Sequence, residues 1–159
     1  MFLKPDYNLK NIYEINLEEL KQRGIKNILF DLDSTIMQSK TASYTEKTLE
    51  WLKKVRKDFF IAVLSNNHNE EYIAKVKPIT DFPMVFCAAK PDTKAAENFL
   101  KDNNLKVSET VIVGDRPLSD IWCGKRLGCM TILVDSISAD VEKPIVRFAR
   151  KLERLTIRK

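Results

Sequence analysis

The chain has 159 residues, of which 44% are hydrophobic and 31% charged, a composition typical of one globular domain rather than a disordered or fibrous chain. Its longest apolar runs have five or six residues, far fewer than the roughly 20 of a membrane helix, and the N-terminus lacks the apolar core of a signal peptide. The three cysteines form no Cys-x-x-Cys pair, which argues against a disulfide framework or a structural zinc site, so we expect a cytoplasmic protein.

Helical patterns and apolar runs alternate along the chain. An N-terminal extension, residues 1–24, holds one helical pattern at 17–23 between a capping Asn16 and Gly24. Strands are expected at 28–32, 59–64, 84–87, 110–113 and 131–134, and helices at 45–57, 69–77, 92–103, 117–127 and 141–157. Strands this continuously apolar are covered on both faces. The alternation therefore predicts an α/β protein with a three-layer α/β/α, Rossmann-like fold and a five-stranded parallel sheet.

Polar residues stand at the carboxyl ends of four of these strands, the edge at which parallel sheets bind ligands. They are Asp31, Asp33 and Thr35, then Ser65 and Asn66, then Lys90, then Asp115 with Asp120. Carboxylates and an ammonium at one edge suit metal-assisted phosphoryl transfer. A carboxylate can be the nucleophile, others can hold Mg²⁺, and the ammonium stabilises the charge of the transferring group.

The run Asp31-Leu-Asp33-Ser-Thr-Ile resembles the first motif, Asp-x-Asp-x-Thr, of the haloacid dehalogenase (HAD) superfamily. Ser65, Lys90 and Gly114-Asp115-x4-Asp120 follow in the order of motifs two, three and four. The resemblance implies a Mg²⁺-dependent phosphatase. In it, Asp31 would be the nucleophile and Asp33 the acid that protonates the leaving oxygen, then the base that activates water.

The resemblance also implies how the metal and the phosphate are held. Mg²⁺ would bind Asp31, the backbone carbonyl of Asp33 and Asp115, with Asp120 supporting that site. Ser65 and Lys90 would hold the phosphoryl oxygens. Thr35 and Asn66 are either further phosphate ligands or ordinary turn residues.

The spacing of the motifs leaves no room for a cap domain. The segment between Asp33 and the helix that starts near Thr45 is short, and a helix and a strand fill the stretch from Ser65 to Lys90. We therefore expect a single capless domain over residues 1–159. An open site of this kind admits a large substrate, such as a protein, a nucleic-acid end or a lipid headgroup, unless oligomerisation closes it.

Within the superfamily, the chain resembles the capless subfamily IIIA and its YqeG-like branch, relatives of the phosphatidylglycerophosphate phosphatases of mitochondria and cyanobacteria. The similarity lies in Lys4-Pro5, Gly114-Asp115-Arg-x-Leu-Ser-Asp120 and Gly124-x3-Gly128-Cys-Met-Thr-Ile-Leu-Val. It implies hydrolysis of phosphatidylglycerophosphate in phosphatidylglycerol and cardiolipin synthesis. Two departures are Ser34, where the branch usually has Asn, and residues 37–44, which lack an expected Trp-containing stretch.

The C-terminal helix carries the excess charge of the chain. Residues 142–159 hold seven basic and two acidic residues, a net +5 that equals the net charge of the whole chain. An apolar stripe runs along the helix at Ile145, Phe148, Ala149, Leu152 and Leu155. We expect this stripe to pack on the sheet, which would leave the basic residues free to contact anionic lipid at the inner face of the membrane. Nucleic acid is a weaker candidate partner, since no binding motif is present.

Other functions fit parts of the pattern. The same chemistry could serve a soluble phosphate ester, a phosphoprotein or a nucleic-acid end. A signalling receiver module would need its phosphorylated Asp after the third strand, where this chain has Cys87-Ala-Ala-Lys90, so that reading is rejected. A non-catalytic HAD scaffold is disfavoured, because the carboxylates and the lysine of the motifs are all present.

Overall fold

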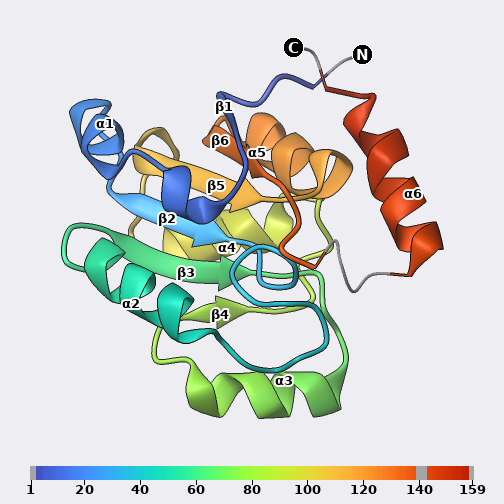
Figure 1. Ribbon diagram of the computed structural model, residues 1–159. Coiled ribbons are helices and arrows are strands. Elements are labelled where there is room, and N and C mark those ends of the chain that lie inside the picture. The colour runs from blue at the N-terminus through green and yellow to red at the C-terminus, as the bar shows by residue number, and fades with distance from the viewer. Residues whose placement is uncertain (1–2, 139–142, 158–159) are drawn as a thin grey trace.

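The computed structural model describes residues 3–138 and 143–157 (Figure 1). A 6-stranded sheet in the order β1-β6-β5-β2-β3-β4 forms its centre, and each neighbouring pair is parallel. The strands are β1 (Tyr7–Leu9), β2 (Asn27–Phe30), β3 (Phe60–Leu64), β4 (Met84–Val85), β5 (Thr110–Gly114) and β6 (Met130–Val134). The predicted parallel α/β sheet is confirmed.

The prediction of five strands was wrong by one. The additional strand, β1, comes from the N-terminal extension and pairs with β6 in the register of Tyr7 with Ile132. It has 3 residues at the edge of the sheet and none of them is buried, so it lacks the apolar run by which the other strands were recognised.

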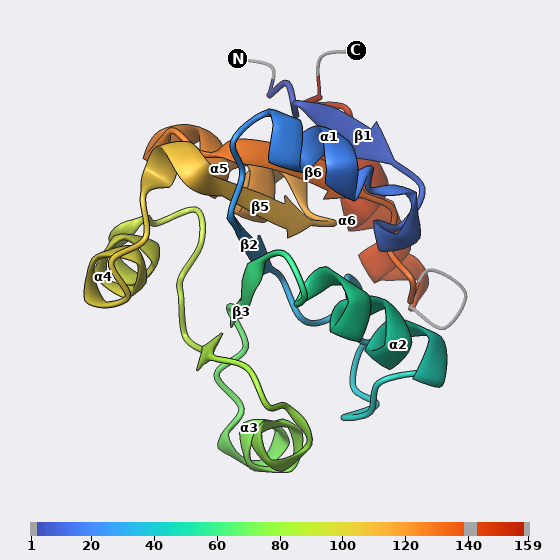
Figure 2. The same cartoon turned by 90° about the vertical axis from the view of Figure 1, so that its left-hand side faces the viewer.

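Helices cover both faces of the sheet. They are α1 (Leu17–Gln22), α2 (Glu46–Val55), α3 (Glu70–Val76), α4 (Lys94–Asp102) and α5 (Trp122–Leu127), and a C-terminal helix, α6 (Pro144–Arg154), lies outside these layers. Side chains alternate along each strand, so Ile28 and Phe30 of β2 pack with residues of α1, α2 and α3, while Leu29 packs with residues of α4 and α5. In Figure 2, α4 and α5 lie to the left of the sheet and α2 to its right.

Local capping explains where the helices start. The side chains of Asn16, Thr45 and Asn69 accept hydrogen bonds from backbone N–H groups in the first turns of α1, α2 and α3, as N-cap residues do. The helix α4 begins at Lys94, two residues after the start of the predicted helix 92–103. Thr93 is its N-cap, and Asp92 accepts a hydrogen bond from the backbone N–H of Lys94 at 2.8 Å.

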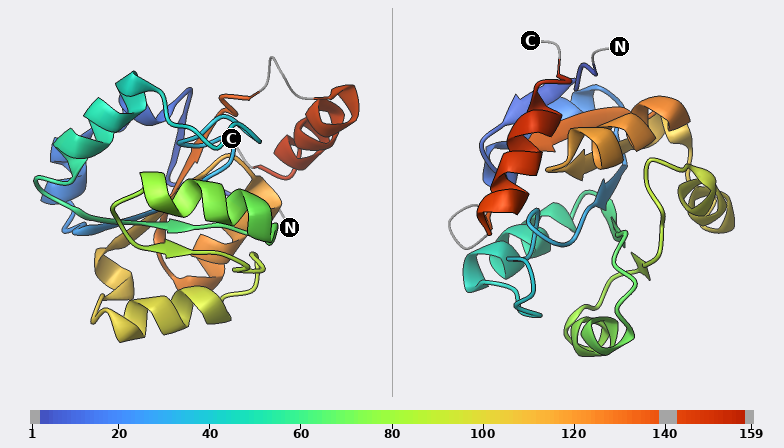
Figure 3. Two further views of the ribbon diagram at one scale, coloured as in Figure 1. Left: turned by 90° about the horizontal axis from the view of Figure 1, so that it is seen from below. Right: turned by 90° about the vertical axis from the view of Figure 1, so that its right-hand side faces the viewer.

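The C-terminal helix α6 stands apart from both helical layers, beside the carboxyl ends of the strands (Figure 1; Figure 3, right). Its apolar stripe does not pack on the sheet, contrary to our expectation. Ile145 is 75% exposed, Phe148 61%, Leu152 49% and Leu155 69%. The helix turns Glu153, which is buried, toward the protein instead. Residues 141–142 of the predicted helix lie outside the described residues.

Candidate active site

The carboxyl ends of neighbouring strands surround one pocket of about 680 Å³. Asp31 follows β2, Ser65 follows β3 and Asp115 follows β5, and these three strands are adjacent in the sheet. Lys90 comes from the segment between β4 and α4. The predicted residues that line the pocket are Asp31, Asp33, Ser65, Asn66, Lys90 and Asp115. The sheet therefore brings these residues of all four motifs to one place.

The ammonium of Lys90 lies buried between two carboxylates. Its Nζ donates to Oδ1 of Asp31 at 3.0 Å, to Oδ1 of Asp120 at 2.6 Å and to the carbonyl of Leu64 at 2.5 Å. Burial by itself lowers the pKa of Lys90, but the charges of Asp120 and Asp31 outweigh it and raise the pKa above its usual value. Lys90 is therefore a fixed cation beside Asp31, and its contact with a phosphoryl group stays a prediction.

Asp120 holds Lys90 in place and is not among the residues that line the pocket. It lies fully buried in a π-helical turn, Pro117–Ile121. Its Oδ1 accepts from Lys90, and its Oδ2 accepts from the backbone N–H of Arg116 at 3.0 Å. Burial and the nearby charge of Asp31 raise the pKa of Asp120, while Lys90 opposes that rise. Both of its oxygens are thus engaged in holding other groups of the site.

Gly114, the last residue of β5, makes room for Asp120. A Cβ at this position would lie 2.2 Å from Cγ of Asp120, far inside van der Waals contact. We expect Gly114→Ala to lower the free energy of unfolding by about 1–3 kcal/mol. It should also reduce kcat, because Asp120 can no longer hold Lys90 in place.

Urea denaturation and steady-state kinetics measure the two effects of Gly114→Ala. Gly24→Ala is the control, since Gly24 has φ +81° with no atom within 4 Å of an added Cβ. That control should lose stability through backbone strain and keep its kcat. Wild-type stability and kcat in Gly114→Ala would show that the close approach of Asp120 is not required.

Asp115 is buried and is held from two sides. Thr35 donates to its Oδ1 at 3.1 Å, and Arg150 of α6 forms an ion pair with its Oδ2. The sequence left Thr35 open as a phosphate ligand or a turn residue. The structure buries Thr35 completely with its hydroxyl on Asp115, so its contact is with a motif carboxylate. A contact of Thr35 with phosphate stays a prediction.

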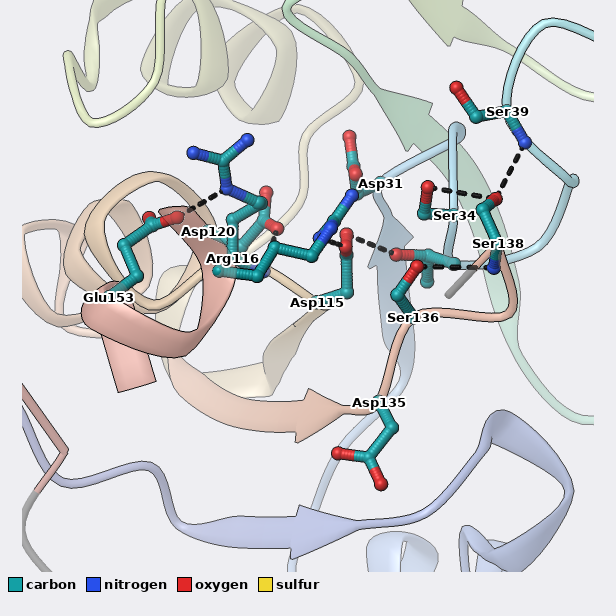
Figure 4. A network of polar contacts seen from close by, with 12 residues as sticks. Asp31, Ser34, Ser39, Asp115, Arg116, Asp120, Asp135, Ser136, Ser138 and Glu153 are labelled. Atoms are coloured by element: carbon teal, nitrogen blue, oxygen red, sulfur yellow. Dashed lines mark hydrogen bonds and ion pairs between the residues drawn. The ribbon is translucent and has the colours of Figure 1, made fainter. Parts of the chain in front are cut away.

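Hydrogen bonds of serine residues connect the loop after β2, which carries Ser34, to the segment after β6 (Figure 4). Ser34 donates to Oγ of Ser138 at 3.0 Å, and the same Oγ accepts from the backbone N–H of Ser39 at 2.7 Å. Ser34 has φ +67°, a left-handed conformation that Asn adopts more readily than Ser. The contact with Ser138 helps hold Ser34 in this strained conformation.

The carboxylate of Asp33 is oriented by two residues that the sequence did not indicate. Tyr72 of α3 donates its hydroxyl to Oδ1 at 2.7 Å, and Asn67 donates its amide to Oδ2 at 3.1 Å. Burial and the hydrogen bond to Asp33 raise the pKa of Tyr72 above its usual value, so it remains a donor. Both contacts fix the direction of the carboxylate.

We expect Tyr72→Phe to lower kcat by about tenfold, because a hydrogen bond that orients a charged group is lost. KM should change little, since Tyr72 is not among the residues that line the pocket. Steady-state kinetics with a phosphate ester measures both values. Tyr13→Phe, which removes a hydroxyl that bonds Thr48 at 2.8 Å, is the matched control. Equal kcat in the two variants would exclude a positioning role for Tyr72.

Asn66 and Ser65 line the pocket and also shape it. The Asn66 amide donates to the backbone carbonyl of Lys90 at 2.9 Å and accepts from the backbone N–H of Lys90 at 2.7 Å. Oγ of Ser65, a buried residue, accepts from the backbone N–H of Asn67 at 3.1 Å. Asn66 thus holds the backbone that carries Lys90. Phosphate contact by either residue stays a prediction.

The remaining wall of the pocket comes from α6 and from the π-helical turn Pro117–Ile121 with its N-cap, Arg116. Arg116 donates from Nε to Glu153 at 2.5 Å, and the backbone N–H of Leu118 donates to Glu153 at 3.0 Å. Arg116, Ala149, Arg150, Leu152 and Glu153 all line the pocket. None of them was predicted as a site residue. The helical pattern showed which residues share a face of α6 and gave no sign of which face meets the protein.

Three carboxylates can supply oxygen ligands to a metal. Asp31, Asp115 and Asp120 each offer one oxygen, and these oxygens lie within 4.8 Å of one another. Oxygen donors of this kind suit Mg²⁺, which takes one or two carboxylates and keeps waters or phosphate oxygens as its other ligands. The carboxylates of Asp31 and Asp115 therefore fit the metal that the sequence implied, and a metal on Asp115 would replace its ion pair with Arg150. Asp120 would support the site from its contact with Lys90, since both of its oxygens already hold other groups.

Comparison with known proteins decides the family. The family model described as mitochondrial PGP phosphatase matches residues 1–138. The chain belongs to this family. It is 32% identical over 153 residues to the probable phosphatase YqeG of Bacillus subtilis (strain 168), covering 96% of this chain and 88% of that relative. The predicted YqeG-like branch is confirmed.

A plant relative extends the comparison of this PGP phosphatase family member. Phosphatidylglycerophosphate phosphatase 1, chloroplastic/mitochondrial, of Arabidopsis thaliana is 29% identical over 161 residues. The match covers 96% of this chain and 46% of the plant protein, so the chain spans less than half the length of that relative.

Solved structures share the fold. A predicted HAD-like family hydrolase from Porphyromonas gingivalis aligns with a TM-score of 0.57 and 14% identity, over 81% of this chain and 98% of that one. An uncharacterized protein from Listeria monocytogenes serotype 4b aligns with a TM-score of 0.56 and 19% identity, over 80% and 99%. Family and fold together make this member of the PGP phosphatase family a HAD-type phosphatase, a phosphoric monoester hydrolase.

Proposed function

We propose that the chain hydrolyses phosphatidylglycerophosphate in phospholipid synthesis, through an aspartyl-phosphate on Asp31. The observation that carries the proposal is the Asp31 carboxylate in the pocket, 3.0 Å from the buried Lys90 ammonium and close to the Asp115 carboxylate. Its side chain is 13% exposed, while that of Lys90 is 2% exposed, so Asp31 is the group that faces a substrate. A nucleophile beside a fixed cation suits attack on a phosphate monoester.

The proposed reaction has two steps. A carboxylate oxygen of Asp31 attacks phosphorus, and the bond from phosphorus to the glycerol oxygen breaks while Asp33 gives its proton to that oxygen. Asp33 then takes a proton from water, whose oxygen attacks the aspartyl-phosphate, so that inorganic phosphate leaves and Asp31 is restored. Tyr72 and Asn67 keep the Asp33 carboxylate directed for both proton transfers.

Asp31, Asp115 and the backbone carbonyl of Asp33 would hold Mg²⁺, with Asp120 in a supporting role. When bound, the ion supplies positive charge to the oxygens of the phosphoryl group. We expect a chelator to abolish phosphate release and added Mg²⁺ to restore it. The measurement is phosphate release before and after chelation, with circular dichroism as the control for folding. Full activity in excess chelator would contradict the metal assignment.

A lipid substrate has support from the relatives and from the site. The name of the plant relative gives phosphatidylglycerophosphate as that protein's substrate. We propose that the chain is a single capless domain, so that its open pocket admits a headgroup attached to a membrane. Among the residues that the structure describes, no helix combines the length and apolar character that crossing a membrane requires. We propose that the protein works from the cytoplasm and contacts the inner face of the membrane peripherally.

Competing substrates are tested side by side. With Mg²⁺ present, kcat/KM should be highest for phosphatidylglycerophosphate in vesicles, and lower for a soluble phosphate ester, a phosphopeptide and a 3′-phosphorylated oligonucleotide. A higher value for one of the other three would assign the chain to that substrate class and refute the lipid proposal.

A further inference from the structure

The helix α6 is attached to the protein by its charged face. Arg150 pairs with Asp115, and Glu153 accepts hydrogen bonds from Arg116 and Leu118. Arg154 donates to the carbonyl of Val134 at 2.7 Å and forms an ion pair with Asp135 at 2.9 Å. Positions 150, 153 and 154 are three or four residues apart and share one side of a helix. These contacts fix which side of α6 faces outward.

The outward side of α6 carries the apolar residues, an orientation opposite to that of an ordinary surface helix. We call them the outer row: Ile145, Phe148, Leu152 and Leu155, which are 75%, 61%, 49% and 69% exposed. Large apolar side chains are normally scattered singly over a surface, and a contiguous group indicates an interaction site. Four of them along about three turns, with Leu155 at the C-cap of the helix, form such a group.

Basic residues border the outer row on the same helix. Arg147 and Lys151 are exposed, and exposed Lys143 precedes the first turn. A helix with an apolar face bordered by Lys and Arg is suited to lie in the interface of an anionic bilayer. A second copy of the chain would bring these like charges together, because a two-fold interface places the same patch on both sides. The charge pattern therefore favours anionic lipid as the occupant.

The outer row continues into the mouth of the active-site pocket. Leu152 belongs to the outer row and also lines the pocket. Ala149, its neighbour on the helix surface, lines the pocket as well. Figure 1 and the right view of Figure 3 show α6 standing at the open edge of the sheet, free of the helical layers. A surface that received the outer row would thus lie next to the pocket mouth.

We propose that α6 is a membrane-docking helix whose outer row enters the headgroup region of an anionic bilayer and places the pocket mouth on the headgroups. This inference rests on the proposed function, since it supplies the way in which the site reaches a lipid phosphate. The contacts of Glu153 and Arg154, which involve no residue assigned to the metal, hold the helix on the enzyme while the outer row contacts lipid. Arg147 and Lys151 contribute attraction to anionic headgroups.

Flotation with vesicles tests the apolar part of the proposal. The full chain is mixed with phosphatidylglycerol and phosphatidylcholine vesicles that contain no phosphatidylglycerophosphate. Ile145→Ser/Phe148→Ser should lower the partition coefficient by about tenfold or more, because two apolar side chains leave the bilayer. The control is Leu49→Ser/Ile79→Ser, at two residues that are each 47% exposed elsewhere on the surface. Equal flotation of the two double variants would overturn the proposal.

A charge series tests the electrostatic part. Arg147→Gln/Lys151→Gln should weaken binding to vesicles with phosphatidylglycerol by about 25-fold at low salt, and by less as salt rises. Lys53→Gln/Lys54→Gln, at two exposed positions on α2, is the charge-matched control and should bind like wild type. Wild-type binding by the Arg147/Lys151 variant, or equal binding of the wild-type chain to pure phosphatidylcholine vesicles, would refute an anionic occupant.

Two further measurements separate this inference from the proposed function. The kcat/KM for a soluble ester should be unchanged in Ile145→Ser/Phe148→Ser, because neither residue is among those that line the pocket. Vesicle binding without lipid hydrolysis would support docking and refute the substrate. Hydrolysis of the lipid by the wild type, with wild-type flotation of Ile145→Ser/Phe148→Ser, would support the substrate and refute docking. Sedimentation velocity tests whether a second copy of the chain occupies the outer row instead of lipid. Lipid docking would be overturned if the wild type were a dimer, Ile145→Ser/Phe148→Ser were a monomer, and both floated equally with vesicles.

Discussion

Asp31→Asn should release phosphate at least about 10⁴-fold more slowly than the wild type, because an amide cannot form the aspartyl-phosphate. The fold should persist. The Asn side-chain oxygen can still accept the hydrogen bond that Lys90 now donates to Oδ1 at 3.0 Å, and Lys90 keeps its ion pair with Asp120. Phosphate release and thermal unfolding followed by circular dichroism measure the two properties.

The loss of activity in Asp33→Asn is compared with that in Asp31→Asn. Asp33→Asn leaves the nucleophile in place and removes the general acid and base, so its loss should be smaller, roughly 10²-fold or more. If Asp31→Asn kept a rate near that of the wild type, the assignment of the nucleophile would be wrong. If both variants lost activity together with their folded structure, the two carboxylates would have structural roles that their contacts do not indicate.

Lys90→Met should have the largest effect on stability, a loss of about 3–5 kcal/mol in the free energy of unfolding. The reason is that Asp120 and Asp31 share one buried cation, at 2.6 and 3.0 Å, and would face each other without it. Phosphate release should fall as well, because the same ammonium is the fixed cation beside the nucleophile Asp31 in our proposal. Urea denaturation and steady-state kinetics measure the two losses.

A second change tests whether the loss in Lys90→Met arises from repulsion between carboxylates. Adding Asp120→Asn to Lys90→Met removes one of the two charges and should restore part of the lost stability. Lys53→Met, at an exposed position on α2, should change the free energy of unfolding by less than about 0.5 kcal/mol. An equal loss in the free energy of unfolding in Lys53→Met and Lys90→Met would show that the buried ion pairs of Lys90 do not stabilise the protein.

The fold and the main site residues were predictable because they depend on order along the chain. Continuous apolar runs marked the strands β2 to β6, and the parallel topology then required their carboxyl ends to meet at one edge. Asp31, Lys90 and Asp115 therefore came together as the spacing of the motifs implied. The edge strand β1 escaped prediction because its Tyr7-Asn-Leu run is short and half-buried.

The contacts across the site could not be read from the sequence, because they depend on how elements are oriented. Tyr72 reaches Asp33 from the first turn of α3, and Arg150 reaches Asp115 from α6, with no motif that marks either residue. The apolar stripe of α6 was recognised correctly, but its direction was wrong. A helical repeat defines a face, and the ion pairs of Arg150, Glu153 and Arg154 with the protein decide that this face turns outward.

We propose that Asp31 removes phosphate from phosphatidylglycerophosphate. The most direct measurement follows both products, inorganic phosphate by a colorimetric assay and phosphatidylglycerol by mass spectrometry, from vesicles that contain the lipid, with Mg²⁺. We expect equal molar amounts of the two products with the wild type and neither with Asp31→Asn. Release of phosphate from a soluble ester by the wild type, with the lipid left unchanged, would contradict this proposal.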